Sequence, residues 1–292
     1  MGIFRPLLFL CLFYVKYSYF HLLMVLSKNT SSLYSISYLI MGKIVSIANQ
    51  KGGVGKTTTA VNLSAGLAAA ERRILLVDLD PQGNSTSGLG IEKTSLSNTI
   101  YEVLIGEKKL EEVIQRTELE FLEVVPSNTA LFGADVELVS VESREKLLRN
   151  AIKEFRQYYE YIFIDCPPSL NLLTINALTA SDSVLVPIQC EYYAMEGLGQ
   201  LLHTIQLVQS QLNIDLEIEG ILLTMYDQRN NLSHQVAQEI RDHFPDKVYQ
   251  TVIPRNIKLS ETPSHGKPII LYDIGCKGSE SYLDLTKEFL YS

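Results

Sequence analysis

A glycine-rich loop between an apolar run and a helix-forming run constrains this chain more than any other feature. The loop lies in the stretch NQKGGVGKTTTAVN, residues 49–62. Residues 55–57 complete the phosphate-binding pattern G-x-x-x-x-G-K-[ST], but Gln50 stands where its first glycine should be. A second lysine, Lys51, follows at once. Because such a loop joins a strand to a helix, it predicts an α/β fold.

Each part of this loop suits the binding of phosphate. Gly52, Gly53 and Gly55 can adopt backbone angles that let N–H groups converge on an anion at a helix N-terminus. Lys56 is placed to neutralise the β- and γ-phosphates, and Thr57 offers a hydroxyl to Mg²⁺. A glycine-rich turn with an incidental lysine is the weaker interpretation, since strand, loop and helix are all expected. We therefore expect a nucleoside triphosphate and Mg²⁺ here, with contacts from Gly52, Gly53, Val54, Gly55, Lys56, Thr57 and Thr58.

Short apolar runs alternate with longer amphipathic runs from Lys43 onward. The expected strands are 43–49, 72–80, 121–127, 159–168, 183–189 and 217–226, and the expected helices are 57–70, 143–155, 172–181, 197–212, 232–244 and 278–292. Continuous apolar runs are typical of strands buried on both faces. The alternation predicts a doubly wound, mainly parallel sheet flanked by helices. No linker interrupts residues 41–292, so we expect one P-loop ATPase domain there.

Residues 1–40 differ in kind from the rest, because they are apolar, rich in aromatic residues and free of acidic ones. The run 6–26 is about long enough to cross a bilayer, although Lys16 and His21 interrupt it. A membrane anchor or an uncleaved signal is one interpretation. We favour an upstream start codon with the natural chain beginning at Met41, since a phosphate-loop domain needs cytosolic nucleotide.

Overall charge and cysteine content narrow the class of protein. The formal net charge is -8, so the chain as a whole repels nucleic acid and any contact with it needs a local basic patch. The four cysteines form no C-x-x-C pair, which gives zinc and dithiol chemistry little support and favours a reducing cytoplasm. Cys166 has no histidine nearby in sequence, so we expect a buried, inert thiol.

Three aspartates are expected at the edge of the sheet that carries the loop. Asp78 ends one apolar run, Asp80 lies two residues on, and Asp165 ends another run, YIFID. Ligands bind at the carboxyl ends of strands in open sheets, where acids can hold Mg²⁺ or orient a water. The alternative is that an acid only caps the turn before Pro81, which we expect of one of the first two acids and not of both.

At this point the chain resembles the ParA/MinD group of ATPases, which share a deviant Walker A motif, K-G-G-x-G-K-T, here at residues 51–57. The segments VDLDPQGNSTSGLG, IDCPPSLNLLTINAL, CEYYAMEGL and VIPRNIKLSETPSHGKPI look specifically like the chromosome-partitioning ParA (Soj) branch. The resemblance runs from Met41 nearly to the C-terminus. The missing first glycine is then a trait of the family.

The resemblance implies roles for individual residues. Lys51 would reach across a homodimer to the partner's ATP, with Gly52 where the subunits meet. Lys51, Lys56 and Asp80 would be catalytic, Asp80 by activating the attacking water. Thr57, Asp78 and Asp165 would surround Mg²⁺, and the adenine would lie near Met225 and Pro254. Without the resemblance, a solvated loop charge would be a serious alternative for Lys51.

The resemblance also implies partners. It predicts non-specific binding of double-stranded DNA by the ATP dimer, and slow hydrolysis stimulated by a ParB-type DNA-binding protein, in the cytoplasm and on the nucleoid. The matching cations are Arg229, Arg255 and Lys258, with Lys267 nearby, although a solvated loop face is the alternative for any one of them.

Two other classes of ATPase are weighed against this one. A MinD-like membrane ATPase would need a basic amphipathic C-terminal helix, whereas residues 278–292 are acidic, so no stable membrane association is expected. An electron-transfer ATPase like the nitrogenase iron protein would need cluster cysteines, and their spacing here offers no convincing set.

Overall fold

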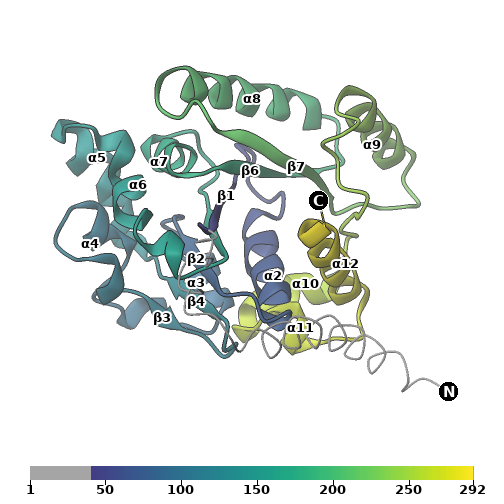
Figure 1. Cartoon of the computed structure of the whole chain (residues 1–292). Helices are drawn as coiled ribbons and strands as arrows, with labels where there is room; N and C mark the ends of the chain where they lie inside the picture. The colour runs from purple at the N-terminus through teal and green to yellow at the C-terminus, as the bar shows by residue number, and fades with distance from the viewer. Residues whose placement is uncertain (1–40, 292) are drawn as a thin grey trace, which may run out of the picture. The chain divides into compact units, whose positions relative to one another are not determined.

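Seven strands form a single sheet at the centre of the computed structural model, which describes residues 41–291 (Figure 1). The strands are β1 (Lys43–Ile47), β2 (Ile74–Asp78), β3 (Gln115–Arg116), β4 (Leu122–Val125), β5 (Tyr161–Asp165), β6 (Ser183–Gln189) and β7 (Glu217–Thr224). Their spatial order is β3-β4-β2-β5-β1-β6-β7, and among these strands only β3 runs antiparallel to its neighbour. The mainly parallel sheet is confirmed. The interpretations offered for residues 1–40 lie outside the described range.

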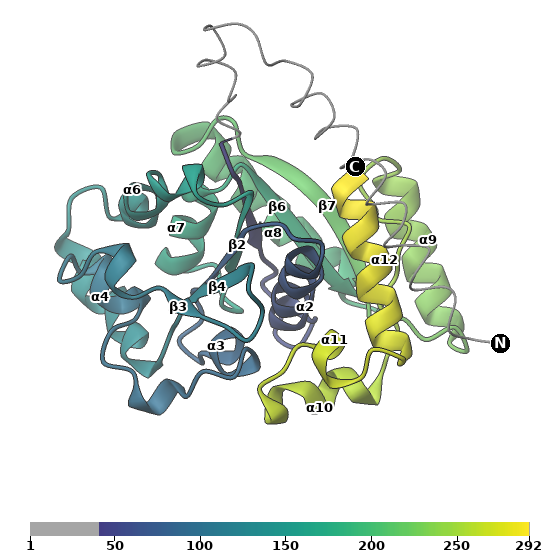
Figure 2. The ribbon, with the colours of Figure 1, turned by 60° about the horizontal axis from the view of Figure 1, so that its bottom comes forward.

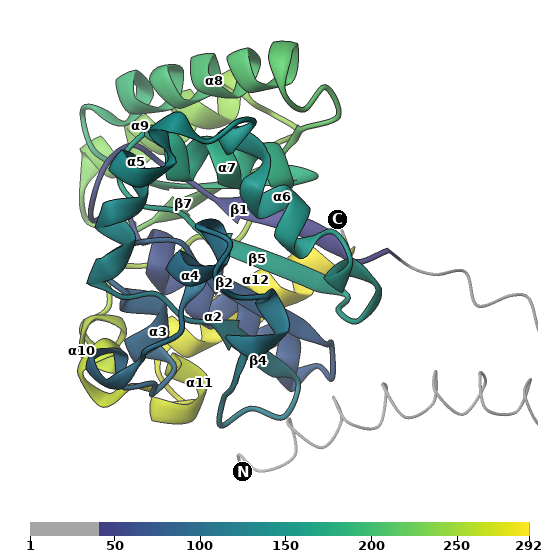
Figure 3. The ribbon, with the colours of Figure 1, turned by 90° about the vertical axis from the view of Figure 1, so that its left-hand side faces the viewer.

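Helices cover both faces of the sheet (Figure 3). They are α2 (Lys56–Ala69), α3 (Asn84–Gly88), α4 (Ile100–Leu104), α5 (Ala134–Glu137), α6 (Leu147–Ile152), α7 (Leu172–Ala180), α8 (Ala194–Gln211), α9 (Asn231–His243), α10 (Ile257–His265), α11 (Ile269–Tyr272) and α12 (Lys277–Tyr291). Alternate residues of one strand enter separate cores: Ile162 and Ile164 of β5 pack on the α7 and α8 side, and Phe163 packs on the α2 and α12 side. Burial on both faces explains why the strands read as continuous apolar runs.

The helix expected at 143–155 is wrong in extent, because only α6 is α-helical there and short 3₁₀ turns flank it. Ser143 has a φ of 54°, which prevents an earlier helical start. The side chain of Asn176 in α7 accepts a hydrogen bond from Leu148 N at 3.1 Å and donates one to Arg144 O at 2.8 Å. Tertiary hydrogen bonds therefore replace the first helical turn of this segment.

Several short helices were not expected from periodicity. One of them, α4, begins with a capping box, in which Tyr101 N donates to the Thr99 hydroxyl and Thr99 N donates to Glu102. The T-x-x-E signal for this start is present in the sequence.

The helix α10 contains Pro263, a residue that disfavours a helix interior. None of the helices within residues 41–291 is long and apolar enough to cross a membrane.

The helix α2 is buried over most of its length and lies beside α12 (Figure 2). Its small side chains let the two helices approach closely. Thr59 Oγ1 lies 3.2 Å from the hydroxyl of Tyr282, and Gly66 faces Thr286. The C-terminal helix thus holds in place the helix that begins at the phosphate loop.

We expect Gly66→Ala to destabilise the protein, although alanine favours a helix over glycine by about 1 kcal/mol. A methyl group on Gly66 would overlap Oγ1 of Thr286, and overpacking typically costs about 1–3 kcal/mol. Thermal unfolding should show a lower Tm, and adding Thr286→Ala should recover much of the stability. The control is Gly199→Ala in α8, where no atom lies within 4 Å of the added methyl group. An unchanged Tm for Gly66→Ala would contradict the close α2–α12 contact.

Candidate phosphate-binding site

The phosphate loop follows β1 at the carboxyl edge of the sheet. In the strand register, Ile47 of β1 is level with Asp165 of β5, which is level with Asp78 of β2. The loop therefore starts beside both carboxylates. Gly53 and Gly55 have φ values of 73° and 88°, a region that favours glycine. The structure thus brings together the loop and two of the acids predicted from sequence.

Neighbouring strands hold the loop at both ends. Asn49 Nδ2 donates to Pro187 O in β6 at 2.8 Å, and Asn49 Oδ1 accepts from Lys51 N at 2.9 Å. At the other end, Thr224 Oγ1 of β7 donates to Val54 O at 2.8 Å. These side-chain contacts, which sequence reasoning missed, fix the backbone whose N–H groups would meet a phosphate.

Lys56 is 6% exposed and curls back over the loop, where its Nζ donates to Lys51 O at 3.1 Å. Among the ion pairs of residues 41–291 it has no acidic partner. Burial lowers the pKa of Lys56, while the negative charges of Asp165 and Asp80 oppose this effect. A buried ammonium without its own counter-ion is suited to an anion such as phosphate.

The second lysine of the loop, Lys51, has an acidic partner and is more exposed than Lys56. Lys51 Nζ forms an ion pair with Glu191 Oε2 at 2.7 Å, and both side chains are partly exposed, at 39% and 46%. Glu191 follows β6, and the exposed Tyr192 and Tyr193 come directly after it. An exposed pair of this kind contributes only about 0–1 kcal/mol, so Lys51 can exchange partners at little cost.

The carboxylate of Asp165 is fully buried and half satisfied. Its Oδ2 accepts a hydrogen bond from Ser85 Oγ at 2.7 Å, whereas Oδ1 lacks a well-formed partner among the described residues. Burial and the charge of Asp78 raise the pKa of Asp165 to about 7, and the hydroxyls of Ser85 and Thr57 oppose the shift. Asp165 thus has one open oxygen, Oδ1, and the hydroxyl of Thr57 acts on the same carboxylate.

The carboxylate of Asp78 is fully satisfied. Its Oδ2 accepts from Thr86 N at 2.8 Å and from Thr86 Oγ1 at 2.7 Å, and its Oδ1 accepts from Asp80 N at 3.2 Å. Burial raises the pKa of Asp78 to about 6, against the effect of these hydrogen bonds. Asp80, 7% exposed, accepts from Gln82 N at 2.9 Å and lies in the turn between β2 and α3.

These contacts bear on how magnesium could be held. Within residues 41–291 there is no cluster of three or more acidic, histidine or cysteine side chains that would form a ready metal site. Thr57 and the open Oδ1 of Asp165 are the oxygen donors that Mg²⁺ prefers, and a magnesium ion typically takes few protein ligands. Asp78 fits a direct ligand less well, because its oxygens are already engaged.

The two residues expected near the adenine are neighbours in the structure. Tyr226 and Pro254 form a parallel bridge, with Tyr226 N donating to Ile253 O at 3.0 Å. Met225 has a φ of 49°, an unusual conformation for a residue with a side chain. This strained residue follows β7 directly. The segment after it, residues 226–230, contains Arg229, one of the cations expected to bind DNA.

The expected DNA-binding residues lie among acids. Arg229 pairs with Asp227 at 3.2 Å, and the charge of Arg255 also acts on that acid. Lys258, in the first turn of α10, pairs with Glu261 at 3.2 Å. Lys267 pairs with Glu118, between β3 and β4, so it faces a different part of the surface. The basic patch is therefore partly neutralised by its own surroundings.

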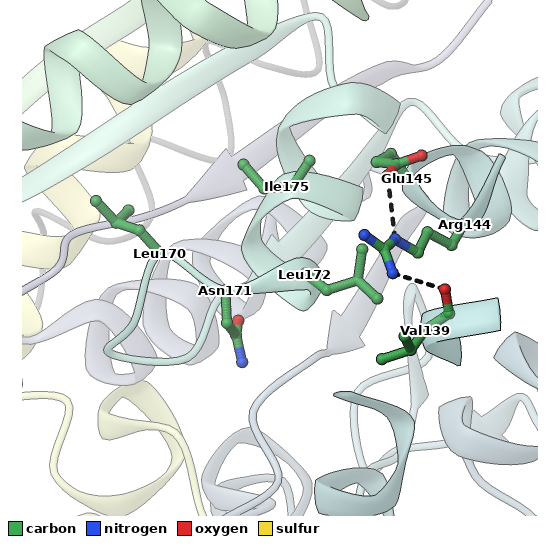
Figure 4. Close-up of a pocket in the computed structure, with 7 residues that line it drawn as sticks. All are labelled: Val139, Arg144, Glu145, Leu170, Asn171, Leu172 and Ile175. Carbon is green, nitrogen blue, oxygen red and sulfur yellow. Dashed lines mark hydrogen bonds and ion pairs between the residues drawn. The ribbon is translucent and has the colours of Figure 1, made fainter. Parts of the chain in front are cut away.

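A cavity of about 500 Å³ lies beside the start of α7, and none of its lining residues belongs to the phosphate loop (Figure 4). It is lined by Val139, Arg144, Glu145, Leu170, Asn171, Leu172 and Ile175. The guanidinium of Arg144 donates to Val139 O at 2.8 Å and to Glu145 Oε1 at 3.2 Å. Its charge is therefore paired with another residue that lines the cavity. The sequence carried no signal for this cavity.

Cys166 is buried, as expected from the sequence, and burial raises the pKa of its thiol above its usual value.

Comparison with known proteins agrees with this geometry. Residues 42–218 match a protein family described as an AAA domain. The sporulation initiation inhibitor protein Soj of Bacillus subtilis is 61% identical over 248 residues, which cover 85% of this chain and 98% of that protein. The chromosome partitioning protein ParA of Myxococcus xanthus is 59% identical over 250 residues, covering 86% and 88%. The chain belongs to the Soj/ParA family.

Solved structures with the same fold include nucleotide-bound ones. This Soj/ParA-family chain is similar to cobyrinic acid a,c-diamide synthase of Mycobacterium smegmatis with a bound ATP analog and magnesium, with a TM-score of 0.75, 37% identity, and coverage of 85% of this chain and 94% of that one. It is also similar to the cell division ATPase MinD of Pyrococcus furiosus, with a TM-score of 0.70, 27% identity and coverage of 86% and 99%. Both likenesses support the doubly wound P-loop fold.

The raised pKa of Asp165 predicts how the stability of the nucleotide-free, metal-free protein depends on pH. Its pKa is about 7 in the folded state, against 3.8 for an unperturbed aspartate side chain. Between these values the folded state binds more protons, so the free energy of unfolding should fall as pH rises through this window. Urea unfolding at pH 5.5 and pH 8 should show the fall, and Asp165→Asn should reduce it and stabilise the protein at pH 8.

The control for this prediction is Asp215→Asn, because Asp215 is exposed and lies after α8. It should leave the pH dependence as in the wild type. If Asp165→Asn behaves like this control, the buried carboxylate does not carry the destabilising charge.

Proposed function

We propose that this protein is a chromosome- or plasmid-partitioning ATPase that binds MgATP at residues 51–58 and hydrolyses it to ADP and phosphate. The observation that carries the proposal is the buried, unpaired Lys56 at the loop, beside an acid with an open oxygen. Two relatives named chromosome partitioning protein ParA and chromosome-partitioning ATPase Soj, from Myxococcus xanthus and Treponema pallidum, give the cellular role.

In the proposed mechanism, backbone N–H groups of the loop and the N-terminus of α2 bind the phosphates, and Lys56 neutralises their charge. Thr57 and Asp165 would hold Mg²⁺, which when bound offsets the charge on the β- and γ-phosphates. Asp80 would orient the attacking water from the turn after β2. Asp78 would act by holding that turn. The base would lie against Met225 and Pro254.

We further propose that the active form is a homodimer joined by ATP. Lys51 would leave Glu191 and reach the partner's nucleotide, acting as a cation supplied in trans. Gly52 supports this role, because it is exposed and a methyl group there would approach only Pro168 within its own chain. The exposed Tyr192 and Tyr193 offer apolar surface beside the same contact.

DNA binding would follow from dimerisation. Arg229, Arg255 and Lys258 make a small patch in each subunit, and nearby acids oppose it. Two copies on one rigid dimer would add their contacts in a single binding event, so the affinity depends on ATP. The contacts would be to phosphate and not to bases, and would bring the cytoplasmic protein to the nucleoid. A ParB-type DNA-binding protein would stimulate an otherwise slow hydrolysis.

A MinD-like, membrane-associated positioning ATPase is the alternative. It would require a C-terminal helix whose apolar face is free to enter a lipid surface. In α12, Tyr282, Leu285 and Phe289 are buried in the core on the α2 side. This packing favours the DNA-partitioning function.

The two lysines of the loop should fail in different ways. Lys56→Ala should abolish ATP binding, because no other lysine or arginine of the same subunit is proposed to neutralise the phosphates. Lys51→Ala should bind ATP but lose ATP-dependent dimers and hydrolysis, since a trans cation contributes a factor of about a thousand or more in rate. Glu191→Gln is the matched variant: it should keep hydrolysis, because it removes the charge that holds Lys51 and leaves Lys51 itself unchanged.

Binding of a fluorescent ATP analogue, light scattering with and without ATP, and phosphate release measure these three properties. Normal dimers and turnover from Lys51→Ala would refute the trans role of this lysine. Normal ATP binding by Lys56→Ala would remove the basis of the proposed phosphate site.

Binding to duplex DNA should require ATP and weaken with salt. Arg229→Ala combined with Lys258→Ala should weaken binding to all sequences alike and flatten the slope of log affinity against log salt, by about 0.9 for each DNA phosphate that is no longer neutralised. ATP hydrolysis without DNA should persist, because neither residue belongs to the phosphate site. The control is Lys153→Ala, an exposed cation after α6.

The measurement is a salt series with the Asp80→Ala protein, which should hold ATP without hydrolysing it. An unchanged slope in the double variant would place the DNA-binding surface elsewhere. A strong preference for one duplex sequence would reject backbone recognition, and equal binding with and without ATP would reject the gating.

A further inference from the structure

Two adjacent hydroxyl side chains in α3 contact the two sheet-end carboxylates separately. Ser85 Oγ donates to Asp165 Oδ2 at 2.7 Å, and Thr86 Oγ1 donates to Asp78 Oδ2 at 2.7 Å. All four residues are fully buried. No water can replace these bonds without space in the core, so loss of either hydroxyl would leave a carboxylate oxygen less satisfied.

The two acids lie side by side, because Asp78 and Asp165 are register partners on neighbouring strands. Like charges at this distance repel, and each side chain would turn away if nothing held it. Bonds from consecutive residues of one short helix hold both. The helix thereby sets which oxygen of each acid accepts a hydroxyl bond, and in Asp165 it leaves the other oxygen open.

We infer that Ser85 and Thr86 are positioning residues for the proposed ATP hydrolysis, with separate tasks. Ser85 occupies Asp165 Oδ2 and so leaves Oδ1 as the open oxygen on the Mg²⁺ side. Thr86 occupies Asp78 and fixes the turn that carries Asp80. The inference rests on the proposed function, because it assigns these tasks within that same site.

The second task follows from a chain of hydrogen bonds. Ser127 N, just beyond β4, donates to Thr86 Oγ1 at 2.9 Å. Thr86 donates in turn to Asp78 Oδ2, and Asp78 Oδ1 accepts from Asp80 N at 3.2 Å. Thr86 thus connects the fixed end of a neighbouring strand to the backbone of Asp80. Without its hydroxyl, Thr86 would keep only its backbone bond to Asp78 Oδ2, and the bond from Ser127 N would lose its acceptor.

The two tasks predict different kinetic defects. Ser85→Ala should raise the Mg²⁺ concentration needed for half-maximal hydrolysis by about tenfold or more, as loss of a partner behind a metal ligand usually does, and leave kcat at saturating Mg²⁺ nearly unchanged. Thr86→Val, of nearly equal shape, should lower kcat by about tenfold or more at saturating Mg²⁺ and leave ATP affinity unchanged. Thr86→Ser should restore most of the kcat.

The matched control is Ser87→Ala in the same helix, since the Ser87 hydroxyl bonds only backbone oxygens of Gly83 and Asn84. It should leave both parameters as in the wild type. Thermal unfolding of each variant separates a folding defect from a kinetic one. A merely structural role for the hydroxyls would lower Tm without producing the split between Mg²⁺ dependence and kcat.

Amide hydrogen exchange of the nucleotide-free protein supplies a readout that needs no activity. Thr86→Val should speed exchange across residues 80–86, and Thr86→Ser and Ser87→Ala should not. Unchanged exchange in Thr86→Val would overturn the anchoring role, whether or not the wild type hydrolyses ATP. If the wild type neither binds nor hydrolyses ATP, the proposed function fails while the exchange result still decides the anchor. Identical Mg²⁺ dependence in Ser85→Ala and the wild type would overturn the role of Ser85.

Discussion

The burial of charge at the carboxyl edge of the sheet is the constraint on which the site depends. Asp78 and Asp165 are fully buried on neighbouring strands, and Lys56 is almost fully buried at the loop beside them. Burial raises the pKa of both acids and lowers that of the lysine, so each group resists its charged form. Keeping these groups charged in the folded protein costs free energy. A ligand that carries both a cation and an anion would lower this cost, because it supplies an opposite charge to each group. Mg²⁺ with a nucleoside triphosphate has this composition.

Several elements of the fold hold that edge in place. β6 and β7 hold the loop through Pro187 and Thr224, and α3 holds the acids through Ser85 and Thr86. Behind them, α12 packs along α2 and fixes the helix whose first residue is Lys56. By contrast, the side chain of Lys51 is held by an exposed ion pair. The residue proposed to change partners is thus the one with the weakest attachment.

Electrostatics also explains why one subunit would be a poor DNA-binding protein. The chain is acidic, and the acids Asp227 and Glu261 pair with two of the cations proposed to contact phosphate. Exposed pairs of this kind are weak, and they compete with a phosphate backbone only when several contacts form together. The proposed dependence of DNA binding on a dimer, and so on ATP, would follow from this balance.

The amino-acid sequence alone determined the parts of this protein that rest on local patterns. Apolar runs predicted the parallel sheet, and the residues 51–57 with the acids at 78, 80 and 165 indicated the phosphate site, because strand ends and glycine-rich turns are encoded within a few residues. Periodicity failed for residues 143–155, where Asn176 from another helix takes the hydrogen bonds of the expected first turn.

Only the tertiary structure decided which polar groups meet across distance in the chain. Thr86 and Asp78, Ser85 and Asp165, and Lys51 and Glu191 are joined by the packing of separate strands and helices. Those contacts separate an acid with an open oxygen from one that is fully engaged, a difference that the sequence does not reveal because both acids end similar apolar strands. Side-chain environment in a folded core depends on neighbours brought together by the whole chain, and no local pattern specifies it.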